Sequence, residues 1–333
     1  MTATVHPRPR LAPVASGGPA VLRVRLAART RLADGVVALS LVQNGPAPLP
    51  PWTPGSHIDV HLPGGLVRQY SLCGDPASPQ GWRVAVLLSP GGRGGSAFVH
   101  HALAEGDELT VSMPRNHFEL SDANGYLFVA GGIGITPILP MIAEAERLGR
   151  RWRLAYAGRS RASMAFLNEL GRYGDKVTLW PGDETGRMGL AAQLATIAPG
   201  TAVYCCGPAS LLDDTARHCE ALGLPEGTLH VERFTPQSDV NGDVGGAFEV
   251  ELASSGQVIA VSNRQSVLSA LRAAGVEVLS SCEEGTCGTC ETGILSGVPD
   301  HRDTVLAAAE RAAGDLMMVC VSRSKTPRLV LDL

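Results

Sequence analysis

Cysteine is absent from the first 72 residues of this 333-residue chain, and all eight cysteines fall between Cys73 and Cys320. Long apolar runs are absent as well: no uncharged hydrophobic stretch approaches the ~18 residues of a membrane-spanning helix, and the N-terminal segment lacks the apolar core of a signal peptide. We therefore expect a cytoplasmic protein without a membrane partner. Its clustered thiols should serve metal or redox chemistry rather than disulfides.

Positive charge is also scarce. The net charge is −4 and the isoelectric point is about 6.1, and the basic segments at 8–10 and 159–161 are too short to form a patch. A nucleic-acid partner is therefore not expected. The chain is long enough for two or three domains, each with a substantial core.

Three cysteines do gather in residues 282–290, CEEGTCGTC, with the spacing Cys282-x4-Cys287-x2-Cys290, and Cys320 follows after 29 further residues. Four thiolates suit either tetrahedral zinc or an iron–sulfur cluster. Zinc sites usually combine two C-x2-C pairs, whereas this segment has only one. The C-x4-C-x2-C…C spacing is that of plant-type [2Fe–2S] centres. We therefore predict that cluster, with zinc and a disulfide as the alternatives.

The chain around these cysteines, residues 246–333, resembles a plant-type ferredoxin domain. Two expected strands joined at Ser255-Gly256 precede an expected helix that ends at Gly275. Gly285 and Gly288 allow a tight loop whose backbone N–H groups can point at sulfur. The resemblance implies a β-grasp fold in which a late strand, LMMVCVSRS, supplies the fourth cysteine and all four cysteines bind the cluster.

A glycine-rich turn in the middle of the chain suggests the electron donor. Residues 125–149, GYLFVAGGIGITPILPMIAEAERLG, predict a strand, a turn and a helix with Thr136 as its N-cap and Pro137 as its first residue. Glycines allow the backbone to approach a pyrophosphate, and a helix N-terminus offers N–H groups to it. A purely structural turn is the alternative, because the motif is not G-x-G-x-x-G.

Two more strand–helix segments begin near residues 151 and 201, which predicts a parallel α/β domain with its ligand at the carboxyl ends of the strands. The succession of GGIGITP and, later, CGP resembles the pyridine-nucleotide domain of the ferredoxin–NADP reductase superfamily. The resemblance implies two groups of residues that bind NADH: Gly131, Gly132, Gly134, Thr136 and Pro137 at the pyrophosphate, and Cys206, Gly207 and Pro208 beside the nicotinamide. Cys206 is thereby a candidate catalytic residue, with an ordinary buried cysteine as the alternative.

A flavin is expected in the first 122 residues, because hydride brings two electrons whereas the cluster accepts one at a time. Six short alternating runs separated by turn residues predict an antiparallel six-stranded barrel. They lie at 22–32, 35–43, 57–63, 66–72, 82–89 and 107–114.

The segment RQYSL (68–72) resembles the R-x-Y-S/T flavin motif of the same superfamily. This implies that Arg68 binds the flavin phosphate, that Tyr70 lies on the isoalloxazine and that Ser71 lies near N5 as a catalytic residue. The turn at Gly94, Gly95 and Ser96 offers a second phosphate cradle. A barrel strand with an exposed arginine and a half-buried tyrosine is the alternative.

The order of these parts resembles that of the phthalate dioxygenase reductase and vanillate demethylase reductase family. This implies FMN rather than FAD and NADH rather than NADPH, although Arg159 and Arg161 could serve a 2′-phosphate. The segment HVERF (230–234) also resembles that family, which implies that Phe234 shields the flavin. A core phenylalanine is the alternative.

We therefore predict a disordered arm (1–18), an FMN-binding barrel (19–122), a nucleotide-binding α/β domain (123–235), a linker (236–245) and a ferredoxin domain (246–333). The family implies a monomeric reductase that passes electrons from NADH through FMN and the cluster to a terminal oxygenase. This partner is either a Rieske non-haem iron enzyme or a cytochrome P450, and it acts on an aromatic compound, for example by O-demethylation. A free-standing diaphorase and a redox sensor are the alternatives.

Overall fold

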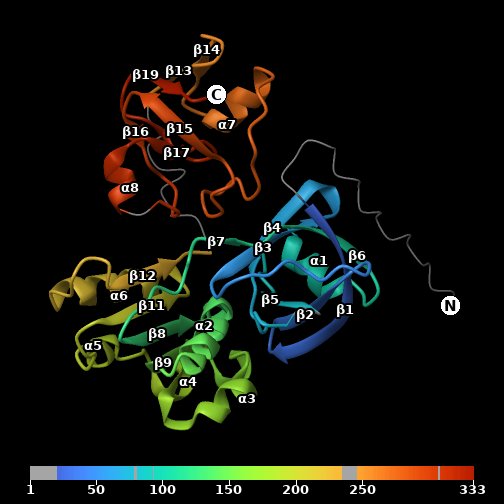
Figure 1. The fold of residues 1–333 in the computed structure, drawn as a ribbon, viewed down its shortest axis with the longest axis vertical. Helices are drawn as coiled ribbons and strands as arrows, with labels where there is room; N and C mark the ends of the chain where they lie inside the picture. Colours follow the sequence, from blue (N-terminus) through green and yellow to red (C-terminus); the bar gives the residue numbers. More distant parts are fainter. Residues whose placement is uncertain (1–20, 79–80, 93, 235–245, 307) are drawn as a thin grey trace. The chain divides into compact units, whose positions relative to one another are not determined.

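The computed structural model describes residues 21–78, 81–92, 94–234, 246–306 and 308–333. They belong to two compact units, Met1–Glu232 and Arg233–Leu333 (Figure 1). The predicted arm (1–18) and linker (236–245) lie outside the described residues. The predicted barrel and the predicted α/β domain as far as Glu232 fall in the first unit, and the predicted ferredoxin domain falls in the second.

The first part of unit one is an antiparallel barrel. Its strands follow the order β4-β3-β6-β1-β2-β5, and a bridge between Leu72 and Val84 joins the two outer strands and closes the ring. The predicted six-stranded barrel is thereby confirmed. The elements are β1 (Val21–Ala33), β2 (Val36–Gln43), β3 (Ser56–Leu62), β4 (Leu66–Ser71), β5 (Trp82–Leu87), α1 (Gly95–His101), β6 (Glu108–Ser112) and the short β7 (Arg115–Asn116), which pairs with β3.

The second part of unit one is a parallel sheet in the order β10-β9-β8-β11-β12, as predicted. The central strand β8 is buried along its whole length, as expected for a parallel strand that helices cover on both faces. Its strands are β8 (Gly125–Gly131), β9 (Arg151–Gly158), β10 (Val177–Pro181), β11 (Thr201–Cys206) and β12 (Leu229–Glu232). Its helices are α2 (Ile135–Arg147), α3 (Leu167–Leu170), α4 (Gly182–Thr185), α5 (Leu190–Leu194) and α6 (Ala209–Ala221).

The predicted start of α2 is wrong. A 3-10 turn, Gly132–Gly134, runs directly into the helix, which begins at Ile135 with Gly134 in the cap position and no side-chain cap. The Thr136 hydroxyl lies inside the first turn and donates a hydrogen bond to Ile133 O at 2.9 Å. Pro137 is tolerated there because the first-turn N–H groups have no partner within the helix.

The barrel and the parallel sheet share one hydrophobic core. Cys73 and Ala85 of the barrel are buried in the same cluster as Tyr156 and Phe166 of the α/β part. Burial of this common apolar surface holds the two parts of unit one together.

Unit two has the expected β-grasp arrangement. Its sheet follows the order β14-β13-β19-β15-β17, with β13 parallel to β19. Gly256, at φ 69°, makes the predicted turn, and the Ser266 hydroxyl caps α7 by accepting a bond from the Ser269 N–H. The elements are β13 (Phe248–Leu252), β14 (Val258–Val261), α7 (Val267–Ala273), β15 (Glu291–Ser296), β16 (Pro299–Asp300), α8 (Ala308–Ala313), β17 (Leu316–Met318), β18 (Arg323–Ser324) and β19 (Arg328–Leu331).

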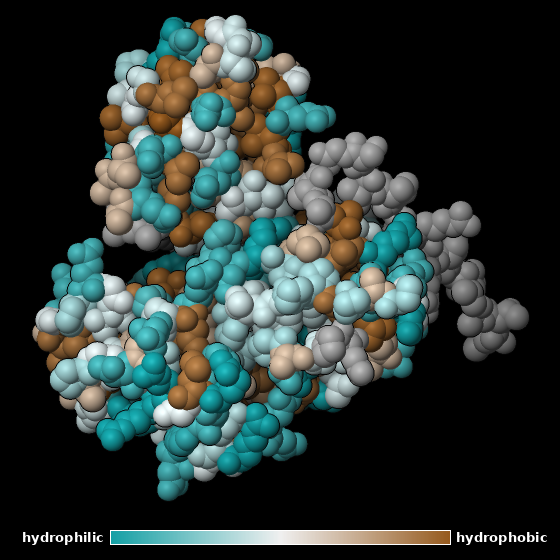
Figure 2. Space-filling model, viewed as in Figure 1, coloured by the Kyte–Doolittle hydropathy of each residue, from teal (hydrophilic) through white to brown (hydrophobic). Residues whose placement is uncertain are grey.

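One detail of this unit differs from the expectation: Cys320 lies in a turn after β17 and not in a strand. Large hydrophobic side chains exposed here include Leu279, Leu295 and Val298, and Figure 2 shows hydrophobic areas on the visible face of this unit. Within the described ranges, no helix has the length and apolar character needed to cross a membrane.

Candidate functional site

The four predicted ligand cysteines, Cys282, Cys287, Cys290 and Cys320, are all buried in unit two. The Cys282 thiol is in hydrogen-bonding contact with Cys287 and Cys320, and Cys290 is in contact with Cys320. The fold therefore brings all four sulfurs into one group, although they come from two segments of the chain.

Four thiols suit either a position for a single tetrahedral zinc ion or a diiron cluster. Among the residues that the structure describes, no set of three or more His, Cys, Asp or Glu side chains is arranged around one such position. A two-iron cluster divides its four thiolates between two metals, so its ligands need not converge on one point. The spacing of the four cysteines favours the diiron cluster over tetrahedral zinc.

Backbone N–H groups of the loop are directed at sulfur. Those of Glu284 and Thr286 lie 3.3 and 3.5 Å from Cys282 Sγ. Hydrogen bonds with Cys287, with Cys320 and from these neighbours together lower the pKa of Cys282 below that of an ordinary thiol. The two backbone N–H groups thus favour the thiolate of Cys282, which is the form that binds metal.

Gly285 is required by the shape of the loop. Its φ is +70°, and a Cβ at this position would lie 2.5 Å from Val321 Cγ2. The Thr304 N–H donates to Gly285 O at 2.9 Å and ties the loop to the following segment. Glycine here permits both the backbone conformation and the close approach.

Asp303 supports the cysteine loop and was missed by the sequence reasoning. Its carboxylate is fully buried and accepts hydrogen bonds from the N–H groups of Val305 (3.0 Å) and Leu306 (2.9 Å) and from the Arg311 guanidinium (3.3 Å). The sequence signal is local: an aspartate that binds N–H groups two and three residues later forms an Asx-type turn.

The predicted flavin residues lie on neighbouring elements of the barrel. Arg68 and Tyr70 project to one side of β4, opposite Val60 and Ile58 of β3, while Ser71 projects to the other side. Burial raises the pKa of Tyr70 to about 12, so its phenol stays neutral.

Arg68 lies against the start of α1, where the second phosphate cradle is predicted. A Cβ on Gly95 would lie 2.7 Å from Arg68 Cγ, and Gly94 has φ +84°. The Ser96 hydroxyl oxygen accepts the Ser89 N–H at 3.0 Å and closes this loop. The structure therefore brings Arg68 together with the glycine turn, in a cradle that a larger side chain would fill.

The two predicted nucleotide motifs meet at the carboxyl ends of β8 and β11. A Cβ on Gly134 would lie 2.2 Å from Cys206 O, and one on Gly131 would lie 2.7 Å from Pro208 Cδ. Gly207 is also closely packed, since a Cβ added there would lie 2.9 Å from Gly131 Cα. Glycine is therefore needed in both turns, and the motifs form one surface at the edge where parallel sheets bind ligands.

Glu232 is a further candidate residue that the sequence reasoning missed. It pairs in register with Cys206 at the ends of β12 and β11, and Cys206 Sγ lies 3.9 Å from its Oε2. Burial raises the pKa of Cys206 well above that of an ordinary thiol and raises the pKa of Glu232 to about 8. The pair is therefore mostly uncharged at neutral pH. Its segment, HVERF, gives no sign that this glutamate faces a thiol.

The last predicted flavin residue, Phe234, belongs to unit two and is 39 % exposed. Its place against the flavin stays a prediction. So does the direct contact of Thr136 with a pyrophosphate, because its buried hydroxyl already donates to Ile133 O.

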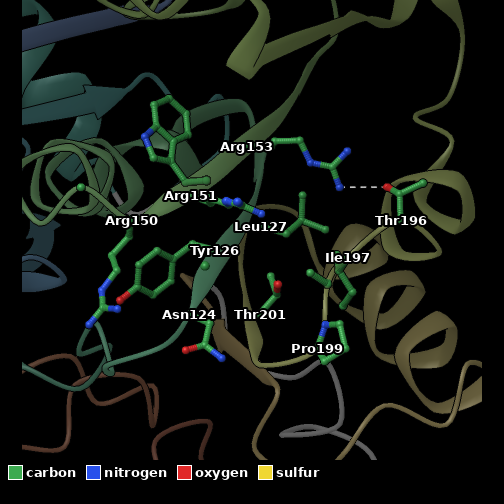
Figure 3. Close-up of a pocket in the computed structure, with 14 residues that line it drawn as sticks. Asn124, Tyr126, Leu127, Arg150, Arg151, Arg153, Thr196, Ile197, Pro199 and Thr201 are labelled. Atoms are coloured by element: carbon green, nitrogen blue, oxygen red, sulfur yellow. Dashed lines mark hydrogen bonds between the residues drawn. The ribbon is translucent and has the colours of Figure 1, made fainter.

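A hollow of about 630 Å³ lies at the opposite edge of the parallel sheet (Figure 3). The amino ends of β8, β9 and β11 line it, and Arg150, Arg151 and Arg153 are among the lining residues. The Arg153 guanidinium donates to Thr196 Oγ1 at 2.9 Å across it. The glycine turns are at the other ends of these strands, so this hollow is separate from the candidate nucleotide site.

Comparison with known proteins gives the family of the chain. Residues 250–325 match the family model of the 2Fe-2S iron-sulfur cluster binding domain. The chain is 43 % identical to phenoxybenzoate dioxygenase subunit beta of Ectopseudomonas oleovorans, over 90 % of this chain and 94 % of that protein. The solved structure of phthalate dioxygenase reductase, a modular structure for electron transfer from pyridine nucleotides to [2Fe–2S], is 38 % identical with a TM-score of 0.69, over 94 % of this chain and 98 % of that one.

An intact type IV self-sufficient cytochrome P450 monooxygenase contains a similar stretch, with 44 % identity and a TM-score of 0.89 over 97 % of this chain. The chain spans 43 % of that longer protein.

The barrel, the parallel sheet and the cluster-binding domain define an iron–sulfur oxidoreductase with a pyridine-nucleotide reductase fold. Within this class, the chain belongs to the phthalate dioxygenase reductase family. The predicted family and class of enzyme are thereby confirmed, and the expected cofactor set, FMN, NADH and [2Fe–2S], is that of the family.

Proposed function

We propose that this protein is the reductase component of an oxygenase system and that it passes electrons from NADH through FMN and a [2Fe–2S] cluster to a terminal oxygenase. The observation that carries the proposal is the grouping of four buried cysteine thiols in a ferredoxin-like unit, in a chain whose other unit joins two glycine turns at one sheet edge.

Arg68 and the turn at Gly94, Gly95 and Ser96 bind the FMN phosphate, with the backbone N–H groups of Gly95 and Ser96 as donors, since the Gly94 N–H donates to Gly92 O at 2.8 Å. The guanidinium supplies a fixed pair of donors, and the contact between Arg68 and Gly95 leaves room for nothing larger than a glycine beside it. Tyr70, on the same side of β4 as Arg68, lies on the flavin ring, whereas Ser71 near N5 stays a prediction, because its side chain projects to the other side of the strand. Bound flavin supplies the change from two-electron to one-electron chemistry.

The turn at Gly131, Gly132 and Gly134 receives the NADH pyrophosphate, and the turn at Cys206 receives the nicotinamide. The tight contact between the two turns fixes their separation. Glu232, held mostly protonated by burial, keeps the floor of the nicotinamide site uncharged. An uncharged floor does not oppose binding of the neutral reduced nicotinamide ring. It also does not oppose transfer of hydride to the flavin.

The four cysteines hold the cluster, and the partner docks beside their loop. Leu279, three residues before Cys282, is 51 % exposed and offers apolar contact to that partner. The terminal oxygenase acts on an aromatic compound, and a Rieske non-haem iron enzyme is proposed over a cytochrome P450 because phenoxybenzoate dioxygenase subunit beta and phthalate dioxygenase reductase are similar to this chain over nearly their full lengths. The protein itself acts as a monomer in the cytoplasm, where cysteines outside the cluster stay reduced.

The test replaces one cluster ligand. Cys290→Ser should abolish reduction of cytochrome c by NADH but spare reduction of ferricyanide, because Arg68, Tyr70 and the two nucleotide turns belong to the other unit. Cys219→Ser, at a buried cysteine of α6 outside the proposed sites, is the matched control and should keep both activities.

Loss of both activities in Cys290→Ser with FMN still bound would refute this division of roles. Equal rates of the wild-type protein with any acceptor, without saturable reduction of an oxygenase, would instead indicate a free-standing diaphorase.

A further inference from the structure

The strand order determines where the adenosine half of the dinucleotide lies. The sheet runs β10-β9-β8-β11-β12, and ligands of such sheets lie across the carboxyl ends of the strands. In the proposed function, the pyrophosphate is at the β8 turn and the nicotinamide at the β11 turn. The adenosine half therefore extends in the other direction, over the ends of β9 and β10.

Two charged loops meet at the ends of these strands. The Asp183 N–H, after β10, donates to Arg159 O, after β9, at 3.1 Å. Arg161 in the first loop and Glu184 in the second form a two-point ion pair. Arg161 Nε lies 3.2 Å from Glu184 Oε1 and its terminal nitrogen lies 2.9 Å from Oε2.

The Glu184 carboxylate neutralises the Arg161 guanidinium, the kind of cation that binds a 2′-phosphate. A phosphate monoester carries between one and two negative charges at neutral pH, and NADPH recognition relies on an arginine near the ribose. Here the two arginines of the first loop are matched by two carboxylates of the second, Asp183 and Glu184. The adenosine end therefore has no excess positive charge among these four groups.

We propose that Glu184 sets the preference of this protein for NADH over NADPH by engaging Arg161. The inference rests on the proposed function, which supplies the positions of the pyrophosphate and the nicotinamide. The two side chains are about half exposed, 52 % for Arg161 and 47 % for Glu184. An ion pair between half-exposed side chains is weak. We therefore expect removal of the Glu184 carboxylate to improve binding of a 2′-phosphate roughly fivefold and not by orders of magnitude.

The test measures binding at the adenosine end directly. Full-length protein is titrated by calorimetry with adenosine 2′,5′-bisphosphate and, separately, with adenosine 5′-monophosphate. In Glu184→Gln, the Kd for the bisphosphate should fall roughly fivefold while that for the monophosphate stays within about twofold. The ratio of kcat/KM for NADPH to that for NADH, with ferricyanide as acceptor, should rise by the same factor.

Glu144→Gln is the matched control. Glu144 forms the same kind of two-oxygen pair with Arg147 on α2, in the half of the helix far from the glycine turn. This variant should leave unchanged the ratio of the two Kd values and the ratio of the two kcat/KM values. Adding Arg161→Ala to Glu184→Gln should remove the gain, because the freed guanidinium is its source.

Three results would overturn the inference: wild-type protein that prefers NADPH, a Glu184→Gln variant with unchanged ratios, or a gain that survives Arg161→Ala. If NADH reduces the wild-type protein and only the ratios fail to move, the proposed function stands and Glu184 has no part in specificity. If neither nucleotide reduces the protein, the proposed function falls together with the inference.

Discussion

Arg83 joins the flavin strand to the nucleotide-binding part of unit one. From β5, its guanidinium donates to Cys73 O at 2.8 and 3.3 Å and to the two oxygens of Glu169 at 2.8 and 2.9 Å. It also lies 5.1 Å from the centre of the Phe166 ring. Cys73 comes two residues after Ser71, so one side chain connects the end of the flavin motif to the segment after β9. We expect Arg83→Ala to destabilise unit one and to slow hydride transfer.

The contacts set the size of the effect. Arg83 is 29 % and Glu169 40 % exposed, so their pair contributes about 1 kcal/mol, near the upper end for partly exposed pairs. The buried Cys73 carbonyl would lose its two donors from this side chain, at about 1–2 kcal/mol, and the ring contact adds about 0.5–1 kcal/mol. Arg83→Ala should therefore lower the free energy of unfolding by roughly 2–4 kcal/mol, whereas Glu169→Gln should lower it by only about 1 kcal/mol.

Two assays separate stability from positioning. Urea unfolding gives the free energy, and anaerobic stopped-flow absorbance gives the rate of flavin reduction by NADH. Small misplacements of reacting groups can cost about 100-fold in rate, so the rate should fall in Arg83→Ala under conditions where the protein is fully folded and FMN is bound. Arg83→Lys, which keeps the charge but not the fork of donors, should recover part of the rate.

Arg31→Ala is the control, because Arg31 forms a single exposed pair with Asp34 on the barrel surface, at 75 % and 62 % exposure. It should change stability by less than ~0.5 kcal/mol and leave the rate unaltered. An Arg83→Ala variant that is destabilised but reduces its flavin at the wild-type rate would refute the positioning role. A variant with unchanged stability would refute the energetic argument.

Two further predictions concern single residues. Arg68→Ala should release FMN on desalting without unfolding the barrel, because its guanidinium is the charged partner at the Gly95 cradle, and an unchanged flavin-to-protein ratio would remove Arg68 from the site. Glu232 has its pKa raised from 4.5 to about 8 in the folded protein, so its contribution to stability is complete below pH 4.5 and is lost as pH rises through 8. Between pH 7 and 9 the loss should be about 1.4 kcal/mol, and Glu232→Gln should lack this slope in unfolding curves.

The features that the sequence predicts well are local. Cys282, Cys287 and Cys290 lie within nine residues, so their spacing alone indicates the kind of cluster. Alternation of apolar and polar residues located all six barrel strands, and Gly256 marked a turn that its positive φ requires. Each of these signals depends on interactions between near neighbours in the chain.

The features that the sequence does not reveal join distant segments. Arg83 and Glu169 are 86 residues apart, and Cys206 and Glu232 meet only because β11 and β12 pair in parallel with one particular register. The cap of α2 was misplaced for a related reason. Thr136 is a good cap by residue type, but the close packing of Gly134 on Cys206 O sets the path of the chain, and the helix begins two residues earlier than predicted.

The division into units follows from what each transfer requires. Hydride moves between reacting atoms that must come within about 3.5 Å, so the residues that bind flavin and nucleotide need fixed relative positions. The shared core around Cys73 and Phe166 and the Arg83 contacts supply that rigidity within unit one. The cluster has a different task, because it must also deliver electrons to a separate protein. A unit with its own core, in which Gly285 and Asp303 shape the cysteine loop without help from the barrel or the parallel sheet, meets that requirement.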